Sequence, residues 1–104
     1  MTDDRDGYMS TDILGCQFSI YPLRQSDVDT PVQAAIKAAA AEGCRVRVGN
    51  LSTLISGNED EVFRGLRAAF AAARLEGAAV LTATLAAGMP TDELVADIQL
   101  ELGA

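Results

Sequence analysis

A run of alternating side chains near the start of the chain is the stretch best suited to hold a small molecule. Residues 15–22 read Gly-Cys-Gln-Phe-Ser-Ile-Tyr-Pro. As a strand, this run sends an amide, a hydroxyl and a phenol to one face and apolar side chains to the other. The polar face, formed by Gln17, Ser19 and Tyr21, can donate and accept hydrogen bonds at once. Such a set suits recognition of a small polar molecule.

The residue types needed for common catalysis are missing from the chain. It has no histidine and two cysteines, Cys16 and Cys44, which are not in a CxxC spacing. Without an imidazole, Ser-His-Asp and Cys-His nucleophilic sites and the usual zinc ligand are unavailable. We expect two buried, reduced thiols. The acidic cluster at residues 59–61 suits the first turn of a helix, where carboxylates favour the helix dipole, better than it suits a metal. We therefore expect no enzyme, no cofactor and no metal.

Length and charge narrow the class of protein. The 104 residues predict one domain. Fifteen acidic against eight basic residues give a net charge of -7, which disfavours nucleic acid as a partner and is compatible with a cationic ligand. Residues 1–12 hold four aspartates, so we expect a disordered acidic tail before a single domain over 13–104. Without a secretory signal or a run of ~20 apolar residues, we expect a cytoplasmic location and no membrane insertion.

The order of the expected elements is strand, helix, strand, strand, helix, strand, followed by a short terminal helix. This order is the ferredoxin-like βαββαβ pattern of the α+β class. It predicts a two-layer sandwich: a four-stranded antiparallel sheet carries both long helices on one face, its first and third strands are central, and its last strand flanks the first. The expected strands are 13–22, 45–48, 51–56 and 78–85, and the expected helices follow Thr30, Asn58 and Thr91 and end at Gly43, Gly77 and Gly103.

Both long helices show capping signals at their starts. Thr30 is the expected N-cap of the first, with Pro31 at the first helical position and Gln33 completing a capping box. Asn58 and Glu61 are expected to form the capping box of the second. The apolar face expected for the second helix consists of Val62, Phe63, Leu66, Ala69, Phe70 and Ala73.

The two middle strands are expected to form a hairpin. Gly49 and Asn50 suit a two-residue type II′ turn, which would place Val48 opposite Leu51 and, two residues further, Val46 opposite Thr53. This register puts Ser52 on the polar sheet face and Thr53 on the helix side. A loop longer by one residue would reverse these faces.

The polar positions of several strands converge on one sheet face in this arrangement. The last strand alternates in the same way as the first, so its hydroxyls would lie beside the polar face of residues 17–21. Ser and Thr are also ordinary residues of an exposed strand. Thr53 is expected in the core. Its hydroxyl is then either hydrogen-bonded within the protein or in contact with a ligand in a cleft between the sheet and the helices. The candidate ligand-binding residues are Gln17, Ser19, Tyr21, Ser52, Thr53, Thr82 and Thr84.

Four segments together resemble the YkoF family. They are residues 15–22, 51–57, 59–63 and 81–84, in the order and spacing of that family. Its members are described as hydroxymethylpyrimidine- and thiamine-binding proteins with a ferredoxin-like fold. The resemblance implies thiamine or hydroxymethylpyrimidine as ligand, in precursor salvage or in uptake with a membrane permease as partner. The family's prototype carries two such domains in tandem, so for this single domain we expect a homodimer or a higher homo-oligomer.

Other functions remain open at this point. In a ferredoxin-like oligomerisation or regulatory module, the polar sheet face would be a subunit interface. An acylphosphatase-like enzyme would need a phosphate-binding loop, and residues 23–29 lack a glycine-rich cradle. A cofactor-free oxygenase is compatible with the fold alone, although no base for it stands out. An RNA-binding sheet would show basic charge and adjacent surface aromatics, and Tyr21 alone does not meet that requirement.

Overall fold

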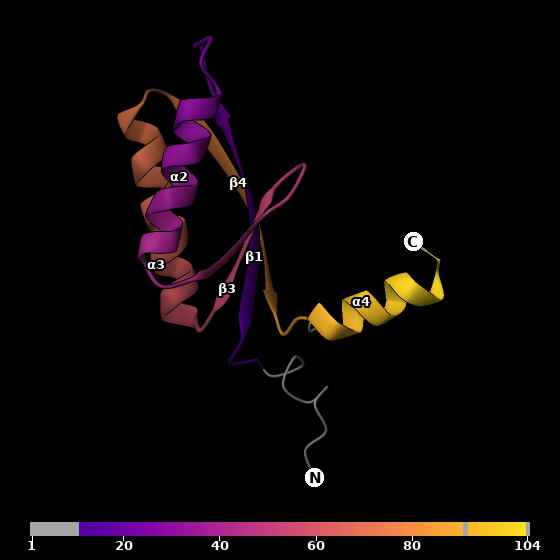
Figure 1. The fold of residues 1–104 in the computed structure, drawn as a ribbon. Coiled ribbons are helices and arrows are strands. Elements are labelled where there is room, and N and C mark those ends of the chain that lie inside the picture. The colour runs from indigo at the N-terminus through magenta and orange to yellow at the C-terminus, as the bar shows by residue number, and fades with distance from the viewer. Residues whose placement is uncertain (1–10, 91, 104) are drawn as a thin grey trace.

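The computed structural model describes residues 11–90 and 92–103 (Figure 1). The prediction of a disordered tail over residues 1–12 falls mostly on residues 1–10, and the predicted cap Thr91 also lies outside the described residues. The elements are β1 (Leu14–Pro22), α2 (Asp29–Ala41), β2 (Arg45–Val48), β3 (Thr53–Gly57), α3 (Glu59–Leu75), β4 (Ala79–Ala87) and α4 (Asp92–Glu101).

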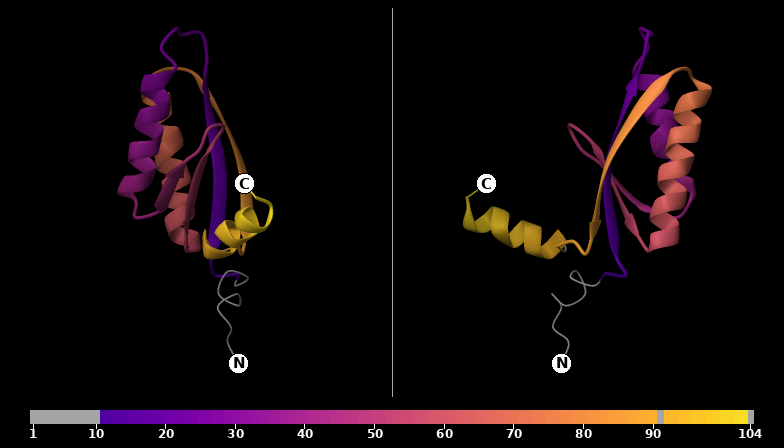
Figure 2. Two further views of the ribbon diagram at one scale, coloured as in Figure 1. Left: turned by 45° about the vertical axis from the view of Figure 1, so that its right-hand side comes forward. Right: turned by 180° about the vertical axis from the view of Figure 1, so that it is seen from behind.

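The four strands form one antiparallel sheet in the order β2-β3-β1-β4. β3 and β1 are central and β4 flanks β1, as predicted. Helices α2 and α3 lie side by side on one face of this sheet, while α4 points away from the opposite face (Figures 1 and 2). The fold is therefore the predicted ferredoxin-like α+β sandwich with an additional C-terminal helix.

The core lies between the sheet and the two long helices. The sheet contributes buried side chains at alternating positions, and the helices contribute mainly alanines. Small side chains let two helices approach the sheet and each other closely. The buried apolar residues are Cys16, Phe18, Ile20, Ala35, Ala39, Cys44, Ile55, Val62, Ala69 and Ala73.

The start of α3 follows the prediction. The Asn58 Oδ1 accepts a hydrogen bond from the Glu61 backbone N–H at 2.8 Å, and the Glu61 Oε1 accepts one from the Asn58 N–H at 2.9 Å. This reciprocal pair is a complete capping box. It satisfies two backbone donors that the first helical turn would otherwise leave free.

The predicted cap of α2 is wrong. The helix begins at Asp29 rather than after Thr30, and no side chain caps it from the N-cap position. Instead, the Asp27 carboxylate accepts from the N–H groups of Asp29 and Thr30, both at 3.1 Å, and from the Thr30 hydroxyl at 2.6 Å. A carboxylate two residues before the helix reaches its first free donors, so Thr30 serves as a donor and not as the cap. These hydrogen bonds, led by that of the Thr30 side chain, lower the pKa of Asp27.

The predicted two-residue hairpin turn is also wrong. Val48 pairs with Thr53 and Val46 with Ile55, so four residues, 49–52, connect the strands. The Gly49 N–H donates to the Ser52 carbonyl at 2.9 Å and closes this longer loop. The register differs from the expected one by two residues, which preserves the face of every paired side chain. Thr53 therefore lies in the core as predicted, while Ser52 belongs to the loop.

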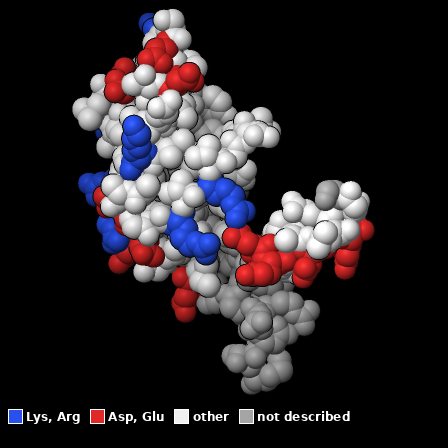
Figure 3. Space-filling view, in the orientation of Figure 1, with Lys and Arg blue, Asp and Glu red and all other residues white. Residues whose placement is uncertain are grey.

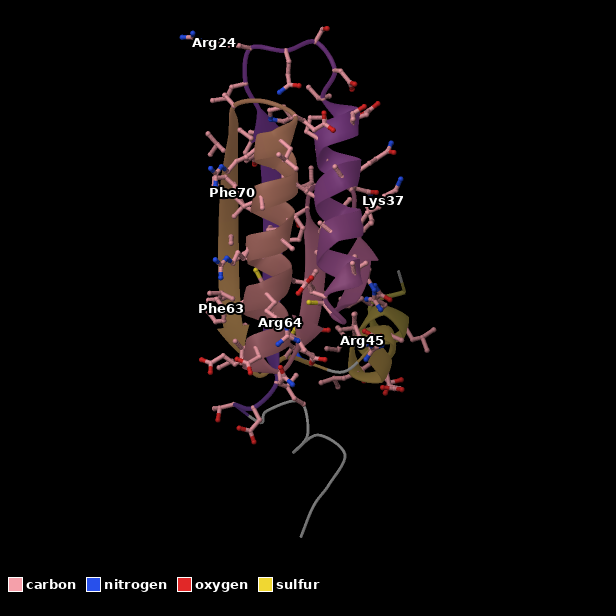
Figure 4. All side chains as sticks on the ribbon, turned by 90° about the vertical axis from the view of Figure 1, so that its left-hand side faces the viewer. Arg24, Lys37, Arg45, Phe63, Arg64 and Phe70 are labelled. Carbon is pink, nitrogen blue, oxygen red and sulfur yellow. The ribbon has the colours of Figure 1, made fainter. Side chains whose placement is uncertain are left out.

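Two phenylalanines of α3 are less buried than their periodicity predicted. Phe63 and Phe70 are 46% and 37% exposed, on the side of the helix that faces β4 (Figure 4). Leu85 of β4 is on the helix side of the sheet by its pairing with Cys16, yet it is 46% exposed. The exposure of all three side chains has the same cause. Two helices cover the middle of a four-stranded sheet and leave the border between α3 and β4 open.

The C-terminal helix α4 contributes no buried residue. The Arg47 guanidinium lies 2.9 Å from the Asp92 carboxylate, and that of Arg45 lies 3.7 Å from it. Figure 3 shows acidic and basic side chains meeting where this helix leaves the sheet. Within residues 11–90 and 92–103, no helix has the length and apolar character that crossing a bilayer requires.

Candidate functional site

A cavity of about 200 Å³ lies where β1 extends beyond the end of β3. Pairing of these strands runs from Leu14 opposite Gly57 to Phe18 opposite Thr53, while β1 continues to Pro22. The hairpin loop 49–52 occupies part of the space beyond β3, and α2 lies over it. The length difference between two neighbouring strands therefore creates the cavity.

The cavity has apolar and polar walls. Val32 and Ile36, one turn apart on α2, form an apolar wall with the helix-side residues of β1. The polar groups come from Ser19 and Tyr21 of β1 and from the hairpin residues 50–53. An apolar cavity with a few converging polar groups is typical of a small-molecule site.

Thr53 is the most distinctive polar group of the cavity wall. It is 5% exposed and lines the cavity. Within residues 11–90 and 92–103, no side-chain nitrogen or oxygen atom is both fully buried and without a hydrogen-bond partner, so both roles that the sequence left open for Thr53 stay predictions. The cavity is the place from which a partner can reach it.

Two hydrogen bonds fasten the hairpin loop to β1. The Gln17 Nε2 donates to the Ser52 Oγ at 2.6 Å, and the Ser19 Oγ donates to the Leu51 carbonyl at 3.2 Å. Gln17 itself does not line the cavity. Its amide therefore positions Ser52, and through Ser52 the loop that forms one cavity wall.

The predicted polar sheet face exists, but it is not the cavity. Thr84 pairs with Gln17, and Thr82 pairs with Ser19, so these side chains form one row on the face away from the long helices. That face is open over β4, where both threonines are exposed. The structure thus places the predicted site residues in two groups: Ser19, Tyr21, Ser52 and Thr53 line the cavity, and Gln17, Thr82 and Thr84 lie on the open face.

Val32, Ile36 and Asn50 are among the wall residues that sequence reasoning did not select. Val32 and Ile36 had the helical spacing of core residues, which gave no sign that a cavity borders them. Asn50 was assigned to a two-residue turn. The four-residue loop instead makes it part of the wall. The only sequence signal for the cavity was that β1 is longer than β3, the strand of the hairpin that pairs with it.

The two cysteines are poorly suited to chemistry. Both are free and buried. Burial, and then the proximity of Cys44, raises the pKa of Cys16. Burial, followed by the charge of Glu61, raises the pKa of Cys44. The Cys44 thiol donates to the Glu61 carbonyl oxygen at 2.8 Å. At neutral pH both thiols are therefore protonated and weakly nucleophilic. In the described part of the chain, no cluster of three or more metal-ligating side chains occurs.

Solved structures share this fold. A protein of Methanocaldococcus jannascii superposes with a TM-score of 0.70 at 17% identity, over 88% of this chain and 97% of that one. A domain of unknown function, DUF77, from Bacillus cereus gives 0.69 at 25% identity, over 81% and 88%. A Thermotoga maritima protein, named as a candidate thiamine biosynthesis/salvage protein, gives 0.57 at 17% identity, over 83% and 98%. No curated protein matches the chain.

The sequence itself decides the family. Residues 13–92, from the strand β1 to the first residue of α4, match the profile of the YKOF-related family. The match includes every element that builds the sheet, the two long helices and the cavity. It therefore agrees with the resemblance seen in the four segments of the sequence, and the chain belongs to the YKOF-related family.

Proposed function

We propose that this protein is a non-catalytic, cytoplasmic binding protein for hydroxymethylpyrimidine, or for thiamine through that moiety, in salvage or uptake of thiamine precursors. The single observation that carries the proposal is the position of Thr53, a threonine only 5% exposed, in the wall of the cavity. Membership of the YKOF-related family and the thiamine-related name of one structural neighbour support a thiamine-related role.

The chemistry of the cavity suits an aminopyrimidine. Such a ring presents nitrogen acceptors, an amino donor and two flat faces. Thr53 and Ser52 can each donate to a ring nitrogen or accept from the amino group, and Val32 and Ile36 offer apolar contact to a face. The volume of about 200 Å³ is below the ~300–1,000 Å³ of sites for drug-sized ligands. A single ring therefore fits it better than both rings of thiamine.

In thiamine, the second ring is a cationic thiazolium that would extend out of the cavity. Tyr21 lines the cavity and is 52% exposed, so it belongs to both the cavity and the surface. An aromatic face at this place attracts a cation by about 0.5–1 kcal/mol when exposed. We infer that the pyrimidine provides most of the affinity and the thiazolium a smaller part.

The first prediction tests this proposal with Thr53→Val, which removes the hydroxyl and keeps the shape. Losing one ligand hydrogen bond worth about 0.5–1.5 kcal/mol should weaken hydroxymethylpyrimidine binding about 2- to 13-fold. Calorimetry with hydroxymethylpyrimidine, thiamine and an unrelated pyrimidine measures the affinities. A ligand-dependent rise in melting temperature provides a second reading.

The matched control is Thr84→Val, the same change on the open face outside the cavity. It should leave the affinity unchanged. An equal loss of affinity in the two variants would indicate that the ligand binds on the open sheet face and not in the cavity. A wild-type protein that binds none of these ligands at millimolar concentration contradicts the proposal.

We also propose that the protein acts as a homo-oligomer and, in an uptake role, receives its ligand from a membrane permease. The rival role, an oligomerisation or regulatory module that binds no small molecule, would use the open polar face formed by Gln17, Thr82 and Thr84. The Thr84→Val control bears on that role as well, since it would alter assembly and not ligand affinity.

A further inference from the structure

The outer edge of β4 lacks the protection that natural edge strands carry. The strand is nine residues long and pairs with β1 in unbroken register, from Pro22 opposite Ala79 to Leu14 opposite Ala87. No charged residue occurs between Gly77 and Met89, and β4 contains no proline. Long, regular and uncharged edges favour pairing with another strand. The opposite edge of the sheet differs, because β2 has four residues and two of them are arginines.

An apolar strip lies directly beside this edge. Phe63 and Phe70 project from α3 on the side toward β4 (Figure 4). Leu85 lies on the helix-facing side of β4, because it pairs with the buried Cys16. Each remains between 37% and 46% exposed. In a chain with 22% charged residues, an open strand edge continuous with exposed aromatic side chains is an unusual combination.

The charged side chains at the two ends of this side of α3, Asp60 and Arg74, are complementary in an antiparallel pair. The side chains at helical spacing along it are Asp60, Phe63, Arg67, Phe70 and Arg74. Two such helices placed antiparallel bring Asp60 of one opposite Arg74 of the other and Phe63 opposite Phe70. Arg67 falls at the centre, where its long side chain can extend toward solvent. Arg74 already lies over its own Phe70 ring, 5.9 Å from the centroid. A second copy of this chain in the antiparallel orientation therefore brings acid opposite base at both ends of the helix pair.

We propose that β4 and the adjacent side of α3 form a two-fold interface with a second copy of this chain. The two β4 strands pair antiparallel and join the four strands of each copy into one continuous sheet. Facing residues in an antiparallel pair share a side of the sheet, so the two-fold axis stands perpendicular to the sheet near Ala83 and both helix layers lie on the same side. Each chain then covers the exposed Phe63, Phe70 and Leu85 of the other.

This interface is separate from the ligand proposal. The cavity borders β1 on its β3 side, whereas β4 lies on the other side of β1. The open polar face with Thr82 and Thr84 also stays free, because pairing through the edge uses backbone groups and the helix side of the sheet. Assembly through β4 can therefore be correct whether or not the cavity binds a pyrimidine.

The second prediction is that Ala83→Lys breaks the assembly. Ala83 is exposed in the isolated chain, so the lysine leaves the fold intact, yet in the pair two lysines face each other at the axis. Like charges opposed in an interface cost several kcal/mol, so the dissociation constant should rise more than about tenfold. Light scattering after size exclusion should give about twice 10.9 kDa for the wild type and 10.9 kDa for the variant.

The matched control is Ala40→Lys, the same change at an exposed position of α2, away from β4. It should keep the assembled mass. A second test exchanges the charges: Arg74→Asp alone should weaken the pair, and adding Asp60→Arg should restore it, which no other surface explains. A wild type that stays monomeric over the micromolar range overturns the proposal, and so does an Ala83→Lys variant that keeps its mass together with a failed restoration.

Discussion

At the scale of single residues, Gly65 determines how closely α3 approaches its surroundings. A Cβ at this position would lie 2.5 Å from the Cys44 Sγ, 3.3 Å from the Ile55 Cδ1 and 3.6 Å from the Ala39 carbonyl oxygen. The site therefore has room for a hydrogen atom and no more. Because Ala39 belongs to α2, the same contact also sets the place of the helix that carries two wall residues of the cavity.

The third prediction is that Gly65→Ala destabilises the protein. Alanine is favoured over glycine inside a helix by about 1 kcal/mol. Overpacking a filled core costs about 1–3 kcal/mol, and the overlap with the Cys44 sulfur makes the second effect larger here. Urea unfolding should show a lower free energy of unfolding.

The control for this prediction removes the obstacle. In a Cys44→Ala background the sulfur is absent, so Gly65→Ala should cost less than in the wild type. The difference is a coupling free energy that a double-mutant cycle measures directly. A Gly65→Ala variant that is more stable than the wild type would contradict the prediction, because it would show that the core accommodates the added methyl group.

At the scale of elements, the two long helices start by different means. The Asn58 and Glu61 side chains cap α3 from within the predicted motif. Helix α2 relies on the Asp27 carboxylate, which lies outside the helix and accepts hydrogen bonds from the Thr30 N–H and hydroxyl. Because the folded state lowers the pKa of Asp27, this contribution is present above the carboxyl's unfolded pKa and is lost as the pH falls through the lower folded value.

The fourth prediction concerns the cap of α3. Asn58→Ala removes the acceptor for the Glu61 N–H and should lower the free energy of unfolding by about 0.5–2 kcal/mol. Asn58→Asp is the matched control, since aspartate caps helices about as well as asparagine. Denaturant unfolding of both variants checks this. If the two variants lost the same stability, the cap would not be the cause.

At the scale of the whole molecule, the sheet and its two long helices form one packed body, and α4 stands outside it. Helix α4 has no buried residue, and its Asp92 pairs with exposed Arg45 and Arg47. Exposed ion pairs are worth about 0–1 kcal/mol. Figure 2 shows the helix extending away from the open face of the sheet.

The fifth prediction is that a chain ending at Pro90 folds with nearly the stability of the full chain. It should lose less than about 1 kcal/mol, the upper value for the ion pairs of Asp92. The measurement is urea unfolding of both forms at low protein concentration. Arg47→Ala serves as control, because it should lower stability slightly in the full chain and not in the shortened one. A shortened chain that fails to fold would contradict the separation of α4 from the core.

Features with a local cause could be predicted from the sequence. The alternation from Cys16 to Tyr21 assigns each side chain to a face, because successive strand residues point to opposite sides. The capping box of Asn58 and Glu61 depends on residues three apart, and the order of strands and helices determines the ferredoxin-like arrangement. Thr53 was placed in the core despite an incorrect turn, because a register error of two residues keeps the face.

Features that depend on segments far apart in the chain were decided by the tertiary structure. Periodicity marked Phe63 and Phe70 as apolar, but whether another element covers them depends on how far α3 reaches over β4. The cavity exists because β1 extends beyond the end of β3 and α2 lies over the space that remains. This arrangement involves three segments that are far apart in the chain, so no local sequence pattern could predict it. By itself, the sequence determined the fold and the polar groups available to a ligand. The tertiary structure alone decided which of these groups surround a cavity and which strand edge stays open, because both follow from the relative lengths and positions of packed elements.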